Sequence, residues 1–439
     1  GGAIYRALTT TPVRRPEVLG PDYWRGGNLV RAFQAAGAEY LPATSVWAAA
    51  RRDDGAFDLG VTGGRRTARV AETFAARALV IATGTLERPF PIPGWTLPGV
   101  VTAGGVQALL KHAALVPEGR VVFAGSGPLL WQVAWQCLNA GARIDLVLET
   151  IPRGRLAEAM RHAPGFMFSG YLARGLELVR SVRRRARVVE HVEALEAHGE
   201  GRVERVRYAL DGTWQEVAAD ALVLSHGVVP NLHLAAALGC EIAWNPTQAC
   251  FEPVVDDWGG TTIGNVFVAG DGAGVAGVEA AIARGRLAAL AVANALGRID
   301  AARRDADAEA PRRAVAHGQR GRAFLDVLYR PADAFRRPHG DTLVCRCEEV
   351  TAREVRDAVR AGATDVDALA AATRCGTGPC QGRFCTLTAC EIAAEERGVS
   401  PADVGHPRVR FPVRPVTPAE ATAWRDTPGA ERAAAPKPR

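Results

Sequence analysis

Lysine is almost absent from this sequence. Only Lys111 and Lys437 are lysines, so arginine supplies 51 of the 53 basic residues. The arginines are scattered, apart from a run at 183–185, and no basic stripe alternates with aromatic residues. A protein that tracks a phosphate backbone needs such a stripe. Despite the net charge of +6, we therefore expect no nucleic-acid partner, and we attribute the excess of arginine to genome composition.

Long hydrophobic runs are also missing. No apolar run reaches the roughly 18 residues that a membrane-spanning helix needs, so we expect no transmembrane span. No repeat of solenoid length is present either. The 439 residues are 48% hydrophobic and 23% charged, which is typical of a globular protein with two to three domains. The sequence starts at Gly1 rather than at methionine, so any signal peptide would lie outside it.

The spacing of the cysteines gives little support for disulfide bonds. Cys137, Cys240 and Cys250 stand alone, without a C-x-x-C pair that could act as a redox disulfide. We expect these three residues to be structural. The other six of the nine cysteines crowd into 345–390. Such crowding in a long chain favours metal ligation over a disulfide framework.

The crowded cysteines contain two closely spaced pairs. Cys345 and Cys347 are separated by one residue, and Cys375 and Cys380 by four. Four thiolates are the ligand set of a 2Fe-2S cluster. The alternatives are a zinc knuckle and plain buried cysteines, but a C-x-C pair is a poor half of a zinc site. We predict an iron–sulfur cluster on these four residues, and Cys385 is the one serious rival for the fourth position.

The residues around the cysteine pairs also fit a cluster. Gly376 and Gly378 allow backbone N–H groups to approach the cluster sulfurs. A helix that begins just after Cys380 would direct its positive end toward the anionic cluster. We expect helices at 351–361 and 386–397, and we place Cys390 in the core.

Three segments predict a strand, a glycine turn and a helix in succession. The apolar runs 78–83, 120–124 and 265–269 lead into Gly84, Gly125 and Gly270. This repetition is typical of doubly wound sheets, so the predicted fold class is α/β. A helix at 102–114 and antiparallel strands within 188–217 are expected between the repeats.

The cysteine motifs carry a resemblance to a known family. CRCEEVT at 345–351 and RCGTGPCQGRFC at 374–385 resemble the C-terminal cluster domain, related to bacterioferritin-associated ferredoxin (BFD), of a group of flavin oxidoreductase subunits. The group includes the FAD/NAD(P)-binding subunits of opine oxidases, hydrogen cyanide synthase and D-hydroxyproline or proline dehydrogenases. The resemblance implies a three-layer flavoprotein with two dinucleotide-binding domains, similar to glutathione and thioredoxin reductases, and a small, mainly helical BFD-like 2Fe-2S domain.

The start of the chain resembles the segment GGQIYR of this group, with Ala3 in place of glutamine. The resemblance implies that Gly1 and Gly2 contact FAD. The unit that precedes this segment in the group holds the glycine loop for the FAD pyrophosphate and occupies about 30 residues. Our sequence does not include that unit, so we expect an N-terminal truncation and an upstream reading frame that encodes the unit.

Two glycine turns have features of the remaining flavin site. Thr83 and Gly84 end the first strand, where a close approach to a cofactor requires glycine. Gly270 and Asp271 resemble the flavoprotein pattern that ends in Gly-Asp, which implies that Asp271 hydrogen-bonds the ribityl chain of FAD. The simpler interpretations are an ordinary turn at Gly84 and a helix-capping aspartate at Asp271.

The middle strand–turn–helix unit resembles a nucleotide site. Gly125 and Gly127 form a G-x-G turn, and Glu149 ends the next strand at the distance expected for a ribose contact. The third glycine position of the fingerprint is Leu130, whose bulk should disturb close packing of the helix on the strand. We therefore expect either a scaffold or an adapted site for a second nucleotide, NAD(P) or ATP-like.

The resemblance gives the expected domain order. Residues 1–97 form the first part of an FAD-binding domain, and 98–220 an inserted NAD(P)-binding-like domain. The second part of the FAD-binding domain is expected at 221–300. A linker with one short helix is expected at 301–341, where Pro311, Pro331 and Pro338 interrupt any long helix. The 2Fe-2S domain at 342–398 and an extended or disordered tail at 399–439, whose end at 430–439 is expected to be disordered, complete the chain.

We expect an FAD- and 2Fe-2S-containing electron-transfer subunit of a heteromeric dehydrogenase or oxidase. A catalytic flavoprotein partner subunit would oxidise an amine, opine or amino-acid-like substrate of the D-hydroxyproline, proline or glycine type, since no substrate base is recognisable in this chain. The alternatives are a stand-alone NAD(P)H-dependent flavin reductase with a soluble acceptor and a non-catalytic iron–sulfur scaffold. Reduced thiolates favour the cytoplasm, with a membrane-peripheral position if electrons enter respiration.

Overall fold

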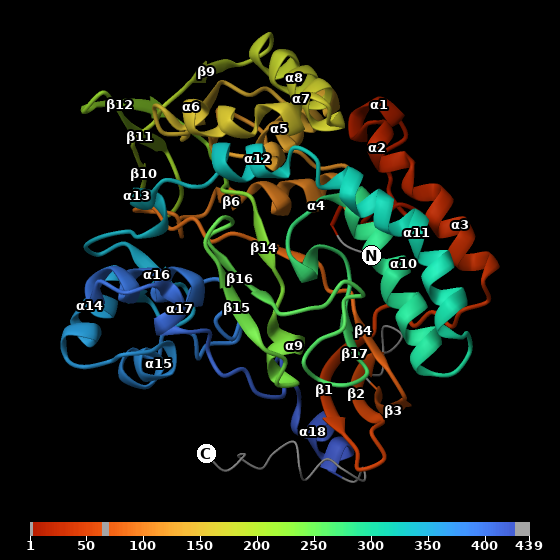
Figure 1. Ribbon diagram of the computed structural model, residues 1–439. Helices are drawn as coiled ribbons and strands as arrows, with labels where there is room; N and C mark the ends of the chain where they lie inside the picture. Colours follow the sequence, from red (N-terminus) through yellow and green to blue (C-terminus); the bar gives the residue numbers. More distant parts are fainter. Residues whose placement is uncertain (1–2, 64–69, 426–439) are drawn as a thin grey trace.

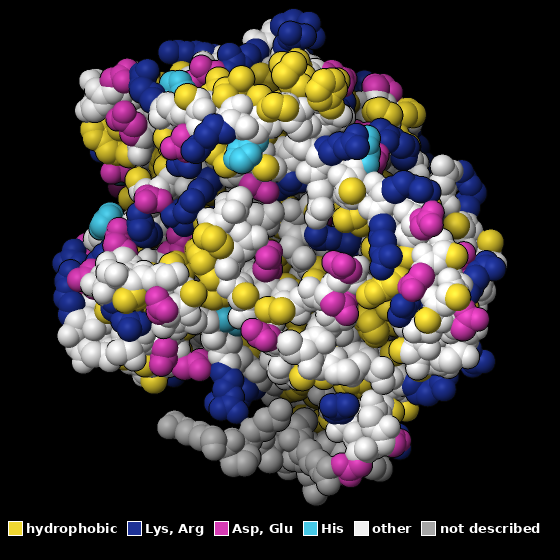
Figure 2. All heavy atoms as spheres, viewed as in Figure 1, with side chains coloured by type: hydrophobic (Ala, Val, Ile, Leu, Met, Phe, Trp, Pro, Cys, Tyr) yellow, Lys and Arg dark blue, Asp and Glu magenta, His cyan; other side chains and the backbone are white. Residues whose placement is uncertain are grey.

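The computed structural model describes residues 3–63 and 70–425. Gly1 and Gly2, which were predicted to contact FAD, lie outside the described residues. The predicted α/β fold with a small helical C-terminal domain is confirmed (Figure 1). Among the described residues, no helix is long and apolar enough to cross a membrane. On the face shown in Figure 2, Lys and Arg side chains are interspersed with Asp and Glu side chains.

The N-terminal region combines short helices with a small sheet. The helices are α1 (Pro16–Leu19), α2 (Pro21–Trp24) and α3 (Gly26–Ala35). Proline suits the first position of α1 and of α2 because the missing N–H has no partner there in any case. An antiparallel sheet follows, formed by β1 (Ser45–Arg51), β2 (Phe57–Gly63) and β3 (Val70–Ala76).

The first and third predicted strand–turn units lie side by side. β4 (Leu79–Ile81) and β17 (Val266–Val268) pair in parallel, with Leu79 opposite Val266. Their carboxyl ends therefore meet at the same edge of the sheet, where ligands bind in α/β folds. This pairing brings the turn at Gly84 beside the turn at Gly270, which opens the short helix η2 (Gly270–Ala273).

The middle unit is a five-stranded parallel sheet. Its strands, in spatial order, are β6 (Val100–Thr102), β13 (Ala221–Ser225), β7 (Val121–Gly125), β8 (Leu146–Glu149) and β9 (Arg187–Val189). Because β13 pairs with both β6 and β7, the unit extends through Ser225, past the boundary expected at 220.

Alternate residues of a strand point to opposite sides of a sheet, and in the middle sheet both sets are apolar. Both faces of this sheet are therefore covered by other elements. One face packs against α4 (Ala103–Ala113), α5 (Pro128–Ala140) and α8 (Gly170–Arg183). The other face packs against an antiparallel meander of β10 (Ala194–His198), β11 (Arg205–Leu210) and β12 (Thr213–Ala218). The helix expected at 102–114 is α4, and the strands expected within 188–217 include this meander.

Shorter elements complete this part of the chain. They are the antiparallel pair β5 (Thr85–Glu87) and β14 (Val228–Pro230), the pair β15 (Ile242–Asn245) and β16 (Cys250–Pro253), and the helices α6 (Arg155–Ala159), η1 (Met160–His162), α7 (Ala163–Met167) and α9 (His233–Ala237).

The expected linker is more helical than the sequence indicated. The expectation that Pro311 interrupts any long helix is wrong, since α11 (Ala301–Gly318) continues through it and packs along α10 (Val278–Ala295) (Figure 1). Proline removes one hydrogen bond from a helix interior, and burial of Pro311 offsets this loss. α12 (Arg322–Leu328) and α13 (Asp333–Arg336) follow, so the stretch holds three helices rather than one.

The cysteine module is small and mainly helical. It consists of β18 (Leu343–Cys345), β19 (Val350–Thr351), α14 (Ala352–Arg360), α15 (Val366–Thr373), α16 (Thr386–Arg397) and α17 (Pro401–Val404). Both predicted helices are present. Thr351 and Glu354 form a capping box, which stabilises the start of α14 locally. Val355, Leu369 and Ile392 are buried in the module's core.

The tail after 399, which was expected to be extended or disordered, returns to the N-terminal sheet and ends in a helix. Val413 N donates a hydrogen bond to Trp47 O over 2.9 Å. α18 (Pro418–Arg425) then packs beside β3, with the Trp424 ring 5.6 Å from the Trp47 ring. Burial of these apolar side chains holds a segment whose prolines alone suggest an extended chain. The end at 430–439, which was predicted to be disordered, lies outside the described residues.

Candidate functional site

Three cysteine sulfurs converge in the cysteine module. The Sγ atoms of Cys345, Cys375 and Cys385 all lie within 4.8 Å of one another. All three residues are buried, and Cys345 is only 1% exposed. Cys345 ends β18, Cys375 follows α15, and Cys385 is the N-cap of α16. Buried thiols at this spacing are a donor set that fits an iron–sulfur cluster.

The other two predicted ligands form a neighbouring pair. The thiols of Cys347 and Cys380 are within hydrogen-bonding range of each other, and Cys347 is exposed. A Cβ atom added to Gly378 would come within 2.2 Å of the Cys347 Cβ, so this loop requires glycine. The predicted four residues therefore do not form one compact group. Two of them converge with the rival, Cys385, and the other two lie beside that group.

The converging thiols are electrostatically coupled. Hydrogen bonds from Cys375 and Cys385 hold the pKa of the Cys345 thiol far below its usual range, and the Gly376 amide adds to this effect. The hydrogen bond with Cys345 raises the pKa of Cys375 to about 12 and also raises that of Cys385. Metal binding would displace protons from these two thiols.

The helix predicted at 386–397 is α16, which begins directly after Cys385 and not directly after Cys380. Its positive end therefore lies at Cys385, inside the group of converging sulfurs, where it favours negative charge. This placement strengthens the case for Cys385 as a ligand.

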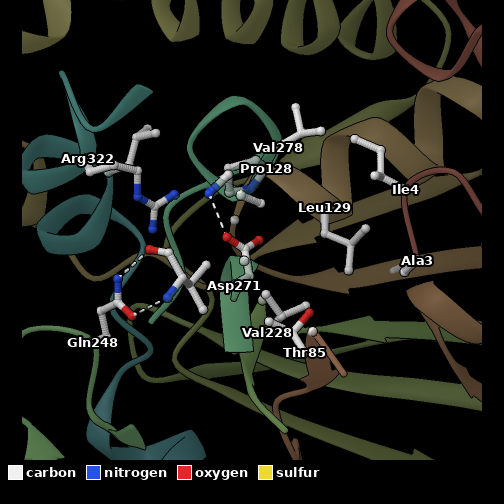
Figure 3. Close-up of a pocket in the computed structure, with 18 of the residues that line it drawn as sticks. Ala3, Ile4, Thr85, Pro128, Leu129, Val228, Gln248, Asp271, Val278 and Arg322 are labelled. Carbon is white, nitrogen blue, oxygen red and sulfur yellow. Dashed lines mark hydrogen bonds between the residues drawn. The ribbon is translucent and has the colours of Figure 1, made fainter. Parts of the chain in front are cut away.

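A second site is a cavity of about 520 Å³ between the β4–β17 sheet, the middle unit and α12 (Figure 3). This volume is in the range of cofactor sites. The predicted residues that line it are Gly84, Gly127, Gly270 and Asp271. The predicted residues that belong to the described chain but lie outside the lining are Thr83, Gly125 and Glu149.

Asp271 both fixes its own loop and faces the cavity. Its Oδ1 accepts hydrogen bonds of 3.0 Å from the amides of Ala276 and Gly277, just before α10. The N-cap of α10 is Gly277, and no side chain caps the helix, so Asp271 fixes the loop before α10 and is not its cap. Within the described residues, Oδ2 has no hydrogen-bond partner, and Figure 3 shows the carboxylate among the cavity residues. One oxygen thus remains for a ligand hydroxyl, which fits the ribityl contact expected from FAD.

The turn after β4 contacts the turn after β17. A Cβ added to Gly272 would lie 3.5 Å from Gly84 O. Gly84 has a φ of 66°, a conformation that favours glycine. Thr83 points elsewhere, because its Oγ1 donates a hydrogen bond to Asn231 O over 3.2 Å. Gly84 therefore fits the predicted close approach to a cofactor, whereas Thr83 links the turn to the segment before α9.

The G-x-G turn of the middle unit is shaped partly by its neighbour strand. A Cβ added to Gly125 would come within 1.8 Å of Ser225 O, so β13 alone requires glycine there. Gly127 has open space around it and lines the cavity. Leu130, at the third fingerprint position, is fully buried in the core between α5 and the sheet. The bulky side chain is accommodated by this core.

Glu149 is not available as an exposed ribose partner. It is 8% exposed, and burial, followed by the nearby Glu190, raises the pKa of its carboxyl to about 7. Burial, followed by the Glu149 carboxylate, also raises the pKa of the Tyr329 phenol, which places Tyr329 close by. Tyr329 is the C-cap of α12 and lines the cavity.

α12 closes the middle unit on the cavity side. Phe324 of α12 stacks on Phe166 at 4.1 Å, and Leu325 packs with Ala159. Leu325 and Tyr329 line the cavity. The linker helix therefore occupies space near the end of β8, where a nucleotide would meet Glu149 in a conventional dinucleotide site.

Glu149 should make stability depend on pH. Its pKa is higher in the folded chain, so it stabilises the fold fully below its unfolded pKa near 4.5, and this contribution is lost as pH rises through about 7. The loss is on the order of 3 kcal/mol. We expect Glu149→Gln to remove most of this dependence, measured as the change in Tm between pH 5 and pH 8. The exposed Glu200→Gln variant should retain it, and equal pH dependence in all three proteins would contradict the assignment.

Two cavity residues were missed by sequence reasoning. Arg88 lines the cavity and donates hydrogen bonds to Ala249 O (2.9 Å) and Gln248 O (2.6 Å). His226 lines it as well, stacks on Phe90 at 3.5 Å, and has a pKa lowered by burial. His226 directly follows β13, and its place at the carboxyl end of a parallel strand was the available signal.

Comparisons with protein families agree with both sites. The model of the family described as pyridine nucleotide-disulphide oxidoreductase matches residues 30–297. The model of the BFD-like 2Fe-2S binding domain matches residues 343–395. The first match covers the cavity except for its N-terminal wall and the wall formed by 322–331. The second contains all five cysteines of the two sulfur groups.

Individual relatives are named as subunits of oxidoreductases. The chain is 43% identical to an opine oxidase subunit from Agrobacterium tumefaciens, over 96% of this chain and 84% of that protein. It is 33% identical to the HcnB subunit of hydrogen cyanide synthase from Pseudomonas aeruginosa, over 77% of this chain and 74% of that protein.

A solved structure shares the fold. The crystal structure of L-proline dehydrogenase from P. horikoshii matches 96% of this chain and 72% of that chain, with a TM-score of 0.68 and 18% identity. The likeness extends over both the cavity and the cysteine module.

Proposed function

Since the chain belongs to the pyridine nucleotide-disulphide oxidoreductase family and has a BFD-like 2Fe-2S binding domain, we propose that it is the FAD- and 2Fe-2S-containing electron-transfer subunit of a heteromeric dehydrogenase or oxidase. It is an oxidoreductase subunit related to those of opine oxidase and hydrogen cyanide synthase. When bound, a flavin exchanges two electrons and an iron–sulfur cluster one at a time.

The observation that carries this proposal is the direct docking of the cysteine module on the cavity wall. Arg336 Nη1 lies 2.5 Å from Glu391 Oε2 on α16, and Arg88 Nη1 lies 3.9 Å from Glu391 Oε1. Arg88 also lines the cavity. Trp95 Nε1 donates a hydrogen bond of 2.8 Å to Leu343 O, two residues before Cys345. Buried contacts of this kind hold two redox sites in one fixed unit.

The chain's own residues have distinct roles in this proposal. Gly84 and Gly270 allow the backbone to approach a flavin, and the free Oδ2 of Asp271 would accept a hydrogen bond from its ribityl chain. Cys345 and Cys385 would hold the cluster, with the remaining ligands drawn from Cys347, Cys375 and Cys380.

The substrate class follows from the relatives. Proteins named as opine oxidase, hydrogen cyanide synthase and sarcosine oxidase subunits are similar to this chain. We infer an amine, opine or amino-acid-like substrate, which a catalytic flavoprotein partner would oxidise. His226 is a poor substrate base, because its Nε2 already faces Thr150 Oγ1 at 2.9 Å and burial lowers its pKa.

Anaerobic absorption spectroscopy with iron, sulfide and flavin analysis tests the proposal. We expect two irons and one flavin per chain and bleaching on addition of dithionite. Iron without flavin would overturn the proposal and favour the iron–sulfur scaffold. Purification from the native host should recover a second flavoprotein subunit, whereas recovery of the chain alone in an active form would contradict the heteromer.

The stand-alone reductase makes a different prediction. Because α12 closes the middle unit and Glu149 is buried, we expect NADH and NADPH to leave the flavin spectrum unchanged under anaerobic conditions, at concentrations where dithionite reduces it fully. Rapid flavin reduction by either nucleotide would instead favour the reductase. Trypsin-digested chain serves as the control for non-enzymatic reduction.

A further inference from the structure

Lys111 occupies a buried position in which an arginine side chain could not make the same hydrogen bonds. Lys111 on α4 is the only lysine among the described residues, since Lys437 lies beyond them. Its side chain is buried, with 1% exposure. A buried ammonium group is costly unless its hydrogen bonds are complete, so its retention in an arginine-rich chain calls for a specific set of partners.

The Lys111 ammonium group has three acceptors. Nζ donates hydrogen bonds to Ala3 O (2.9 Å), Ile4 O (3.0 Å) and Gln107 Oε1 (2.9 Å). It also lies 5.3 Å from the centre of the Tyr23 ring. Three donors and three acceptors match completely, which is the arrangement that a compact ammonium group can satisfy.

Two buried glutamine side chains connect the Lys111 hydrogen bonds to α5 and to the backbone of α1. Gln107 Nε2 donates to Gln136 Oε1 on α5 over 2.9 Å, and Gln136 Nε2 donates to Leu19 O over 3.0 Å. Tyr23 Oη donates to Arg6 O over 3.0 Å. Three backbone carbonyls in 3–6 are thus held by side chains, and two of the three by Lys111.

The segment held in this way is a wall of the cavity. Ala3, Ile4 and Tyr5 line it, as does Gln107 (Figure 3 labels Ala3 and Ile4). Tyr5 is fixed from its other side, because a Cβ added to Gly26 would come within 2.4 Å of the Tyr5 ring. A planar guanidinium group at 111 would be larger and could not direct three donors to the same three oxygens.

We propose that Lys111 is a positioning residue for the flavin site, which holds the backbone of Ala3 and Ile4 so that 3–5 form the cavity wall against the bound flavin. This inference rests on the proposed function, because it requires flavin in the cavity. It assigns a role in the flavin site to the middle unit, since α4 belongs to that unit. Burial, and then the nearby Arg6, lower the pKa of Lys111 to about 7. The charged ammonium form is therefore less stable at this position than in water.

The test compares the flavin-loaded full chain with Lys111→Met, Lys111→Arg and, as matched control on the exposed side of α4, His112→Gln. We expect Lys111→Met to weaken FAD binding at least tenfold, to alter the visible circular dichroism of the residual bound flavin, and to speed hydrogen exchange in 3–8. Lys111→Arg should not restore these properties, and His112→Gln should match the unaltered chain.

The outcomes separate this inference from the proposed function. If the unaltered chain binds no flavin, the proposed function fails first, and the inference fails with it. If the unaltered chain binds flavin, then normal FAD affinity and dichroism in Lys111→Met would overturn the inference alone, even with faster exchange. Lys111→Gln, which retains a hydrogen-bond donor, replaces Lys111→Met if that variant does not fold, and the same criteria apply.

Discussion

Replacement of Cys345 by serine is expected to abolish the iron–sulfur cluster. Cys345 is the shared acceptor among the converging thiols, because Cys375, Cys385 and the Gly376 amide all donate to its sulfur. It is also anchored by β18, next to the Trp95 contact. We expect iron to fall from about two atoms per chain to near zero, with loss of the visible cluster absorption. Electron transfer from the partner to an external acceptor should be lost with it.

A matched cysteine in the same core provides the control. Cys390 is fully buried within α16, and its thiol lies 3.5 Å from Pro401 O, outside the sulfur group. Cys390→Ser should retain both irons. Serine at Cys380 and at Cys385 then identifies the fourth ligand that the sequence left open, since only the ligand variant should lose iron. Full iron content in Cys345→Ser would rule out the assigned centre.

Loss of Arg336 is expected to destabilise the junction between the cysteine module and the cavity. Its side chain is 7% exposed and that of Glu391 is 3% exposed, so Arg336→Met leaves the Glu391 carboxylate buried without its nearest partner, with Arg88 at 3.9 Å. Breaking a buried ion pair by removing one partner costs about 3 to 5 kcal/mol. We expect a loss of this size in the free energy of unfolding of the module, measured by thermal unfolding with the cluster absorption as the probe.

Two further variants distinguish loss of the ion pair from a general loss of packing. Arg303→Met removes an exposed pair with Asp307 at 2.6 Å, which water and salt screen, and should leave the stability nearly unchanged. The double variant Arg336→Met, Glu391→Leu removes both charges and should recover much of the lost stability, because no unpaired carboxylate remains. If Arg336→Met is no worse than Arg303→Met, the buried pair is not what holds the module in place.

Local sequence patterns predicted much of this fold. Apolar runs that end in glycine located β4, β7 and β17 because a buried parallel strand needs apolar residues throughout and a turn at its carboxyl end. The helix expected at 351–361 is present as α14, and its start is stabilised locally by the capping box of Thr351 and Glu354. The cysteine spacing indicated a cluster because ligand type and number depend on few residues.

Features that depend on long-range packing were not predictable in the same way. Pro311 argued for a break, but α11 is held by α10, which no local pattern reveals. The convergence of Cys385 with Cys345 depends on how α16 packs in the module. Lys111 reaches carbonyls 107 and 108 residues away in sequence, so only the folded chain shows its partners.

The returning tail has a consequence for how electrons leave the protein. Gln381 and Arg383, in the loop between Cys380 and Cys385, donate hydrogen bonds to Pro412 O (2.6 Å) and Val413 O (2.7 Å). The tail is in turn fastened to Trp47 of the N-terminal sheet. Under the proposed function, a cluster module tied at its ligand loop stays in place on the protein and does not move as a carrier. An electron acceptor would then come to the protein, near the exposed Cys347.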